Sequence, residues 1–169
     1  MKPTRRAVLA ASTAGLLGVA GCLGGDGPEG GDGSGTPEER SIDTAAYDTT
    51  VVDGVEVPLA PIEDAYYWYQ RQEARFADAR GQTQYDAAHI EGAVHSQARN
   101  AGGEDDPTDD WPMDQRIVCY CGCPHHLSSI RASQLIAEGY ESVYVIDEGF
   151  FEWRDRGYPL AGDDVESVP

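Results

Sequence analysis

The sequence contains little basic charge and almost no lysine. Lys2 is the only lysine among 12 basic residues in a chain of 169, against 30 acidic residues and a formal net charge of −18. A surface that binds nucleic acid needs a basic patch to replace the counterions on phosphates. The shortage of basic residues therefore excludes DNA and RNA as main partners. The length predicts one folded domain with appendages.

The acidic residues are spread along the chain instead of forming one tail. An acidic surface with almost no lysine resembles the surfaces of proteins from salt-loving archaea, which stay folded and soluble in concentrated salt. We therefore interpret the protein as halophilic. Its stability and activity are both expected to rise in molar salt, where the Debye length falls to about 3 Å and repulsion between carboxylates is screened.

Long hydrophobic runs are absent apart from one short stretch near the amino terminus. After the basic pair Arg5 and Arg6, 15 uncharged residues run from Ala7 to Gly21, whereas a membrane-spanning helix needs about 20. This arrangement is typical of a signal peptide. The paired arginines resemble a twin-arginine export signal. The Val-Ala-Gly-Cys sequence that ends at Cys22 resembles a lipobox, whose cysteine receives a lipid after cleavage.

Residues 1–21 are accordingly predicted to be removed, and residues 22–46 to form a tether. Cleavage takes away three basic residues and no acidic one, which changes the net charge from −18 to −21. Glycine dominates the first part of the tether, and such a composition cannot bury enough apolar surface to offset the entropy of ordering. We expect residues 47–169 to form the folded domain. The domain is expected to be exported and attached to the outer face of the cell membrane by a lipid on Cys22.

Strand and helix patterns alternate in the second half of the chain. Strands are predicted at residues 116–120 and 142–146, and helices after Pro61 and at residues 127–138 and 149–156. A hairpin with an Asp53–Gly54 turn comes earlier, and Pro58 and Pro61 are expected to end its second strand. The alternation predicts an α/β fold with a mainly parallel central sheet and helices on both faces.

Three of the four cysteines lie in one short segment that also contains two of the four histidines. Cys121 follows the predicted strand 116–120 and precedes a loop and the amino terminus of a helix. The unpaired N–H groups and the dipole of such a terminus stabilise a thiolate, which is the reactive form of cysteine. Cys121 is therefore the candidate nucleophile. Cys119 lies deeper in the strand and is expected to be a small core residue.

Several motifs, in order and properly spaced, resemble those of the rhodanese family of sulfurtransferases over about residues 62–160. They are Asp78-Ala79-Arg80, the stretch from Tyr85 to Ala93, the strand that runs into Cys121, and the segment from Glu148 to Pro159. The resemblance implies that Cys121 takes a sulfane sulfur from a donor such as thiosulfate. It then holds the sulfur as a persulfide and passes it to a thiol or cyanide. We expect no cofactor and no metal, and the sequence identifies no protein partner.

The loop after the nucleophile is expected to contact the sulfur donor. The expected substrate-binding residues are Gly122, Cys123, Pro124, His125, His126, Leu127 and Ser128, together with Arg80. Arg80 and Asp78 either shape the site or form a buried structural ion pair. The loop is one residue longer than the usual single-domain form and contains no arginine. Although protonated histidines offer donors, this absence leaves a persulfide as an alternative donor to thiosulfate.

Three other interpretations of the loop remain open. Tyrosine phosphatases and arsenate reductases bind oxyanions on similar loops, but they need a bidentate arginine where Leu127 stands. The two thiols of Cys121 and Cys123, with the histidines at 125 and 126, could instead bind copper(I) or zinc, although one crowded loop does not easily form a tetrahedron. The third is a non-catalytic rhodanese-like binding module, or a redox or persulfide carrier in which the two thiols exchange sulfur or form a disulfide.

Replacing Cys22 with serine is expected to release the protein from membranes, because the hydroxyl of serine cannot receive the lipid. The measurement is the distribution of the full chain between membrane and soluble fractions of cells that express it. The Cys123→Ser variant, which keeps Cys22, serves as the control and should stay with the membranes. Equal retention of the Cys22→Ser protein and its parent would show that this cysteine carries no anchor.

Overall fold

The computed structural model describes residues 35–98, 105–122 and 124–166. Residues 1–34, which contain the predicted signal peptide, Cys22 and the first part of the tether, lie outside the described residues, as does Cys123. The described residues belong to one folded unit that begins at Gly35. Among them, no helix is both long enough and apolar enough to cross a bilayer.

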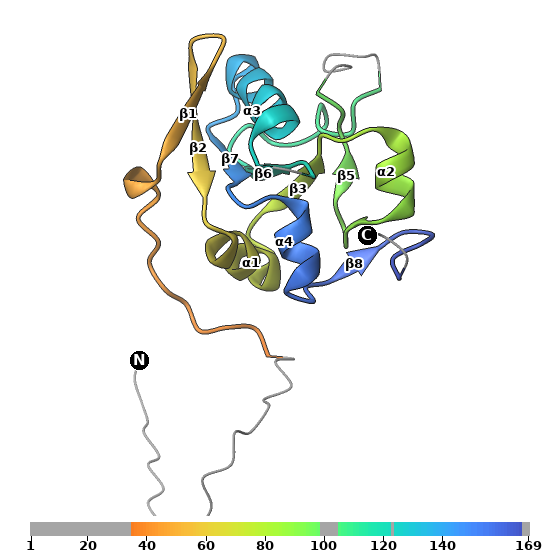
Figure 1. The fold of residues 1–169 in the computed structure, drawn as a ribbon. Coiled ribbons are helices and arrows are strands. Elements are labelled where there is room, and N and C mark those ends of the chain that lie inside the picture. The colour runs from red at the N-terminus through yellow and green to blue at the C-terminus, as the bar shows by residue number, and fades with distance from the viewer. Residues whose placement is uncertain (1–34, 99–104, 123, 167–169) are drawn as a thin grey trace, which may run out of the picture. The chain divides into compact units, whose positions relative to one another are not determined.

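A six-stranded sheet in the order β1-β2-β7-β6-β3-β5 forms the centre of this unit (Figure 1). β1 and β2 pair antiparallel, whereas the other neighbouring strands are parallel. The strands are β1 Thr49–Val52, β2 Val55–Ala60, β3 Arg75–Asp78, β5 Val94–His95, β6 Arg116–Tyr120 and β7 Ser142–Ile146. The mostly parallel sheet confirms the predicted fold class.

Helices cover both faces of the sheet (Figure 1). They are α1 Ile62–Arg71, α2 Gln82–Ala87, α3 His126–Glu138 and α4 Phe150–Asp155, preceded by the short 3-10 helix η1 Thr44–Ala46. Two short strands, β4 His89–Ile90 and β8 Leu160–Ala161, form a separate antiparallel pair. α3 packs on β2, β6 and β7, and α1 and α4 contribute to the core on the opposite face.

Alternate residues of β6 enter two separate cores, because successive side chains of a strand point to opposite faces. Ile117 and Cys119 lie in the core beneath α3, and Val118 and Tyr120 lie in the core beneath α1 and α4. Cys119 is completely buried, which confirms its interpretation as a core residue. The next residue on the α3 face is Cys121, so the strand presents this side chain to the start of α3.

β2 does not end at Pro58, as the sequence suggested, but continues to Ala60. The amide of Leu59 donates to the carbonyl of Asp48 over 2.8 Å, so the ring nitrogen of Pro58 points away from β1. On the side away from β1, β2 pairs with β7, and this pairing begins only at Leu59. The missing N–H of proline therefore removes no hydrogen bond from the sheet, and the strand tolerates it.

The last part of the predicted tether packs against α1. Arg71 donates to the carbonyl of Pro37 over 2.8 Å, and Arg40 forms an ion pair of 2.6 Å with Asp64. The backbone amide of Arg40 also donates to the hydroxyl of Tyr67 over 2.7 Å. Ordered contacts of this domain therefore start before residue 47.

A buried arginine joins α3 to the loop between β5 and β6. The side chain of Arg131 is fully buried, and its guanidinium donates to Ser96 over 2.7 Å and to Thr108 over 2.8 Å. It also lies 3.5 Å from the carboxylate of Asp106, which accepts from the hydroxyl of Ser96. This network therefore holds α3 against the loop between β5 and β6.

Replacing Arg131 with methionine is expected to lower the free energy of unfolding by about 3–5 kcal/mol, because Asp106 would remain buried without its counter-charge. Chemical denaturation in molar salt measures the loss. The matched control is Arg156→Met, which removes an exposed arginine paired with Glu63 and Glu152. That change should lower stability by less than about 1 kcal/mol. Equal effects of the two changes would contradict the role given to the buried network.

Candidate active site

Cys121 lies where β6 ends, and only 2% of its surface is exposed. Its backbone carbonyl accepts a hydrogen bond of 2.9 Å from the amide of Phe150, at the start of α4. Its Sγ lies 3.3 Å from the hydroxyl oxygen of Ser128, in the first turn of α3. A backbone hydrogen bond from α4 thus holds Cys121 on one side. On the other side, the sulfur of Cys121 faces the predicted helix start.

The described part of the cysteine loop turns the chain from β6 into α3. A Cβ atom on Gly122 would lie 3.2 Å from a ring carbon of Phe151 and 3.9 Å from Cδ of Arg80, so only glycine fits without movement. His125 precedes α3 with a positive φ of 64°, a conformation that disfavours non-glycine residues by about 1–2 kcal/mol. Gly122 is therefore a position that other side chains approach closely. His125 is a position with an unfavourable backbone conformation.

The structure places the other predicted loop residues at different depths around Cys121. Pro124 and His126 are exposed, Leu127 is half-buried and Ser128 is buried. Ser128 contacts the sulfur directly, whereas the two exposed residues border solvent. The predicted residue Cys123 lies outside the described residues. The described loop residues therefore divide into one direct sulfur contact and an outer rim.

Asp147 joins the site, although the sequence analysis did not identify it. The Nε2 atom of His125 lies 3.0 Å from a carboxylate oxygen of Asp147, which follows β7. Cys119 pairs with Val145 in the β6–β7 register, so Cys121 and Asp147 end neighbouring strands two positions later. The sequence does contain an acidic residue directly after the predicted strand 142–146. Because parallel strands end at the same edge of a sheet, that position could have indicated a residue of the site.

Arg80 is held by other protein groups. Its guanidinium binds both carboxylate oxygens of Asp78 at 2.6–3.1 Å, donates to the carbonyl of Ala88 over 2.6 Å and lies 3.8 Å above the ring of Phe150. The side chains of Arg80 and Asp78 are 3% and 0% exposed. These contacts favour the structural ion pair over a direct donor contact. Arg80 shapes the site through its stem, which lies beneath Gly122.

Burial determines the reactivity of the Cys119 thiol. It raises the pKa of Cys119 to about 12, and the nearby charge of Arg131 lowers this pKa only in part. A thiol with that pKa stays protonated at neutral pH and is a poor nucleophile. Cys121 lies at the helix start, with its sulfur 3.3 Å from the hydroxyl oxygen of Ser128.

No cluster of three or more histidine, cysteine, aspartate or glutamate side chains suited to a metal ion occurs within residues 35–98, 105–122 and 124–166. His125 and Asp147 form a pair, and Cys121 faces Ser128 instead of a histidine. The described groups therefore offer no preformed metal site. The metal-binding interpretation also requires Cys123, which lies outside them.

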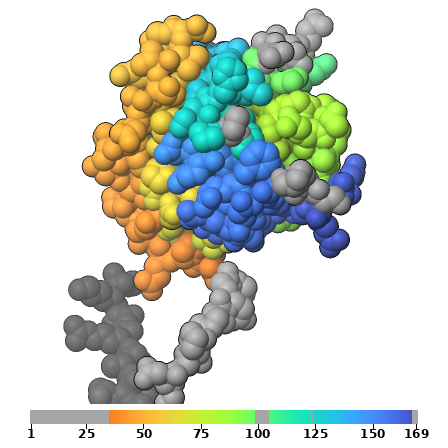
Figure 2. All heavy atoms as spheres, in the orientation of Figure 1, coloured from red at the N-terminus to blue at the C-terminus, as the bar shows by residue number. Residues whose placement is uncertain are grey.

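A pocket of about 530 Å³ opens beside the cysteine loop. The β1–β2 hairpin forms one wall and the start of α3 the other, and Figure 2 shows the two elements next to each other on the surface. The lining residues are Thr50, Val51, Val52, Asp53, Pro124, His125, His126 and Ile130. Three predicted site residues, Pro124, His125 and His126, therefore border a space that can hold a small molecule.

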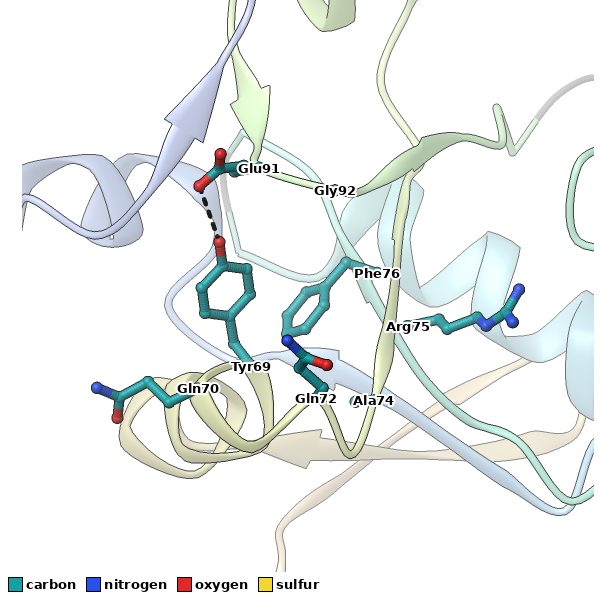
Figure 3. Close-up of a pocket in the computed structure, with 8 residues that line it drawn as sticks. All are labelled: Tyr69, Gln70, Gln72, Ala74, Arg75, Phe76, Glu91 and Gly92. Carbon is teal, nitrogen blue, oxygen red and sulfur yellow. Dashed lines mark hydrogen bonds between the residues drawn. The ribbon is translucent and has the colours of Figure 1, made fainter. Parts of the chain in front are cut away.

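A second pocket of about 400 Å³ lies at the opposite edge of the sheet (Figure 3). Arg75 and Phe76 line it where β3 begins, whereas Cys121 follows the carboxyl end of β6. The hydroxyl of Tyr69 donates to Glu91 over 3.2 Å across this pocket, and burial raises the pKa of Tyr69 to about 12. The pocket contains none of the predicted site residues.

The fold and the cysteine loop define an α/β protein in which Cys121 lies between a parallel strand and a helix start. A model of the rhodanese-like domain matches residues 62–156. The chain therefore belongs to the rhodanese-like domain family. This match covers β3, the cysteine loop, α3 and α4, and it supports a function of the sulfurtransferase type or a related one.

Solved structures share the fold at low sequence identity. The rhodanese-like domain of an Anabaena protein has 18% identity and a TM-score of 0.57, with 66% of this chain and 84% of that chain covered. A protein of Bacillus halodurans has 18% identity and a TM-score of 0.56, with coverages of 63% and 77%. A rhodanese-related protein of Thermoplasma volcanium has 14% identity and a TM-score of 0.53, with coverages of 62% and 98%. These similarities support the fold alone.

Cys119 is expected to resist alkylation by iodoacetamide in the folded protein at pH 8, because its buried thiol remains protonated. Its folded-state pKa is raised to about 12, so this protection should be complete below about pH 9 and be lost as the pH rises toward 12. Peptide mass spectrometry measures the labelling of each cysteine. The same protein in guanidinium chloride is the control. Labelling of Cys119 at equal rates in both conditions would contradict its assignment to the core.

Proposed function

We propose that the protein is a sulfurtransferase that carries a sulfane sulfur as a persulfide on Cys121. The position of this cysteine is the observation that supports the proposal. Cys121 follows a buried strand, and its sulfur lies 3.3 Å from the hydroxyl of Ser128 at the start of α3. A hydroxyl and the N–H groups of a helix start both stabilise a thiolate, and they stabilise the anion of a persulfide in the same way. Membership in the rhodanese-like family supports this chemistry.

The proposed reaction has two displacement steps. The thiolate of Cys121 attacks the sulfane sulfur of the donor, and the donor's sulfur–sulfur bond breaks. The leaving group is sulfite when the donor is thiosulfate, and a thiolate when the donor is a persulfide. An acceptor then attacks the outer sulfur, and Cys121 leaves as a thiolate. The sulfane sulfur passes unchanged in oxidation state, so the cycle requires no external oxidant.

The charges around the site favour a persulfide donor over thiosulfate. The segment from Gly122 to Ser128 contains no arginine or lysine, and Arg80 is committed to Asp78 and Ala88. The net charge of −18 also repels a doubly charged donor in dilute buffer. Molar salt screens this repulsion, so thiosulfate should become a better donor as salt rises.

The location of this activity is a further part of the proposal. The signal-like sequence before Cys22 and the glycine-rich segment after it support export and a lipid anchor on that cysteine. The acidic composition supports function in concentrated salt. The sulfur donor and acceptor would then be small molecules outside the cell.

Serine in place of Cys121 is expected to abolish both persulfide formation and sulfur transfer, because a hydroxyl cannot form the persulfide. The measurement is intact mass after incubation with polysulfide, where one added sulfur marks the loaded protein, followed by transfer to a thiol. Cys119→Ser and Cys123→Ser are the matched controls. The first should mainly lower stability, and the second should keep measurable loading. Loading that survives in Cys121→Ser but disappears in Cys123→Ser would move the nucleophile to residue 123.

A further inference from the structure

We propose that Phe151, in the first turn of α4, determines which sulfur compounds reach Cys121. This role rests on the proposed function and names the substrate class of the same site, which is persulfides and thiols that are unbranched next to the sulfur. It gives a specificity-determining role to a residue outside the cysteine loop. The burial of Cys121, the position of α4, and the contacts and exposure of the Phe151 ring support this role.

Cys121 is almost closed off from solvent. Only 2% of its surface is exposed, and Ser128, whose hydroxyl oxygen lies 3.3 Å from the sulfur, is buried as well. A displacement at sulfur requires the reacting atoms to approach to near contact in the right orientation. A donor or an acceptor therefore has to pass the side chains that border both the loop and solvent. The shape of those side chains limits which compounds can react.

A backbone hydrogen bond fixes the start of α4 beside Cys121. The amide of Phe150 donates to the carbonyl of Cys121 over 2.9 Å. The side chain of Phe150 is fully buried in the core beneath α1 and α4, which holds this end of the helix in place. Figure 2 shows the blue segment that contains α4 next to the cyan segment that contains α3 on one face of the molecule. Phe151, the next residue, therefore has a fixed position relative to the nucleophile.

The ring of Phe151 lies against Gly122, the residue that follows the nucleophile. A Cβ atom on Gly122 would lie 3.2 Å from Cε2 and 3.5 Å from Cζ of this ring. The absence of a side chain at Gly122 is what allows the ring to lie so close to the loop. Cδ of Arg80 would lie 3.9 Å from the same Cβ, and the Arg80 guanidinium is held by Asp78. The ring of Phe151 therefore narrows the loop on the α4 side.

Phe151 borders solvent as well as the loop. Its exposed fraction is 39%, whereas Phe150 is fully buried and Arg80 is 3% exposed. The pocket on the α3 side offers no comparable contact, because neither Cys121 nor Gly122 is among the described residues that line it. We therefore place the approach to the sulfur on the α4 side, where an incoming compound meets the ring of Phe151.

Two neighbouring groups hold the Phe151 ring in one orientation. The ring of Phe150 lies 6.0 Å away at an angle of 65°, and the guanidinium of Arg154 lies 5.0 Å from the centre of the Phe151 ring. Arg154 also forms an ion pair of 2.7 Å with Asp155. Side chains that are held by their neighbours discriminate between ligands by shape more sharply than mobile ones. The ring therefore acts as a fixed wall beside the loop.

A wall at this place selects against bulk next to the reacting sulfur. In the transfer step, the acceptor thiolate attacks the outer sulfur of the persulfide and a new sulfur–sulfur bond forms. The bond to Cys121 breaks, and its electron pair stays on Cys121. The attacking, transferred and leaving sulfur atoms have to lie close to one line. A branch on the carbon beside the attacking sulfur is thereby brought towards Phe151, so unbranched compounds are favoured.

The first measurement tests access to Cys121 without sulfane-sulfur transfer. The full chain in molar salt reacts with methyl or cyclohexyl methanethiosulfonate, which modify a thiolate by the same displacement and differ in the bulk beside the sulfur. Peptide mass spectrometry follows the modification of Cys121. Phe151→Ala should react about tenfold faster than the parent with the cyclohexyl reagent, a gain typical of a change in apolar side-chain size. It should react with the methyl reagent at nearly the parent rate.

The second measurement tests the acceptor. Cys121 is loaded with polysulfide, excess donor is removed, and loss of the persulfide is followed by mass spectrometry after mixing with cysteine or with penicillamine. Penicillamine is cysteine with two methyl groups on the carbon that bears the sulfur. The preference of the parent for cysteine should fall about tenfold in Phe151→Ala. Phe151→Leu, which keeps most of the bulk, should retain most of the preference.

Two matched controls shorten the other exposed large apolar side chains of the described residues. Met113→Ala changes a residue before the amino end of β6 and should leave both ratios at the parent values. Val51→Ala changes a wall of the pocket on the α3 side and should also leave them unchanged. Ratios that changed in Val51→Ala but not in Phe151→Ala would place the approach in that pocket and overturn the proposal.

Equal acceleration of the methyl and cyclohexyl reagents in Phe151→Ala would show a general loosening of the loop and would also overturn the proposal. Normal loading and transfer with both ratios independent of residue 151 would leave the sulfurtransferase function intact and contradict the role of Phe151. If the parent protein took up no sulfur on Cys121, the proposed function would fail, and the substrate class inferred here would fall with it. The methanethiosulfonate ratio would then still report whether Phe151 limits access to the thiol.

Discussion

Burial of β6 on both faces is the constraint on which the site depends. Ile117 and Cys119 lie in the core under α3, and Val118 and Tyr120 lie in the core under α1 and α4. A strand packed on both sides cannot shift its register without moving every side chain to the wrong core. The residue at its end, Cys121, therefore has a fixed position relative to both helix starts. Its sulfur faces Ser128 of α3, and its carbonyl is bound by the first amide of α4.

Two buried arginines support this strand from opposite sides. Arg131 binds Ser96, Thr108 and Asp106 on the α3 side. Arg80 binds Asp78 and the carbonyl of Ala88 on the other side. Both guanidinium groups are neutralised by carboxylates, so they stabilise the scaffold and offer little charge to a bound anion. The site consequently relies on N–H groups, a serine hydroxyl and histidines.

The sequence predicts the features that depend on neighbouring residues, but not those that depend on contacts between distant segments of the chain. Strand 142–146 and the helix that begins at Ile62 are recognisable because burial on a sheet or helix face leaves a periodic pattern in the chain. The candidate nucleophile is recognisable because strand end, loop and helix start are consecutive. Asp147 was missed because its contact with His125 joins segments that are distant in sequence. Pro58 was misread because its tolerance depends on where β7 begins to pair with β2.

The cysteine loop contains no arginine and has instead a histidine that pairs with an aspartate. An arginine in a cysteine loop holds a charged donor by bidentate hydrogen bonds and makes loading on anions favourable. Here the half-buried Leu127 stands before Ser128, and His125 is paired with Asp147. A histidine–carboxylate pair contributes nothing comparable to the binding of an anion, because its carboxylate repels the anion. The described part of the loop is therefore poorly suited to binding a donor of high negative charge. The net charge of −18 acts in the same direction, because it repels such a donor in dilute buffer.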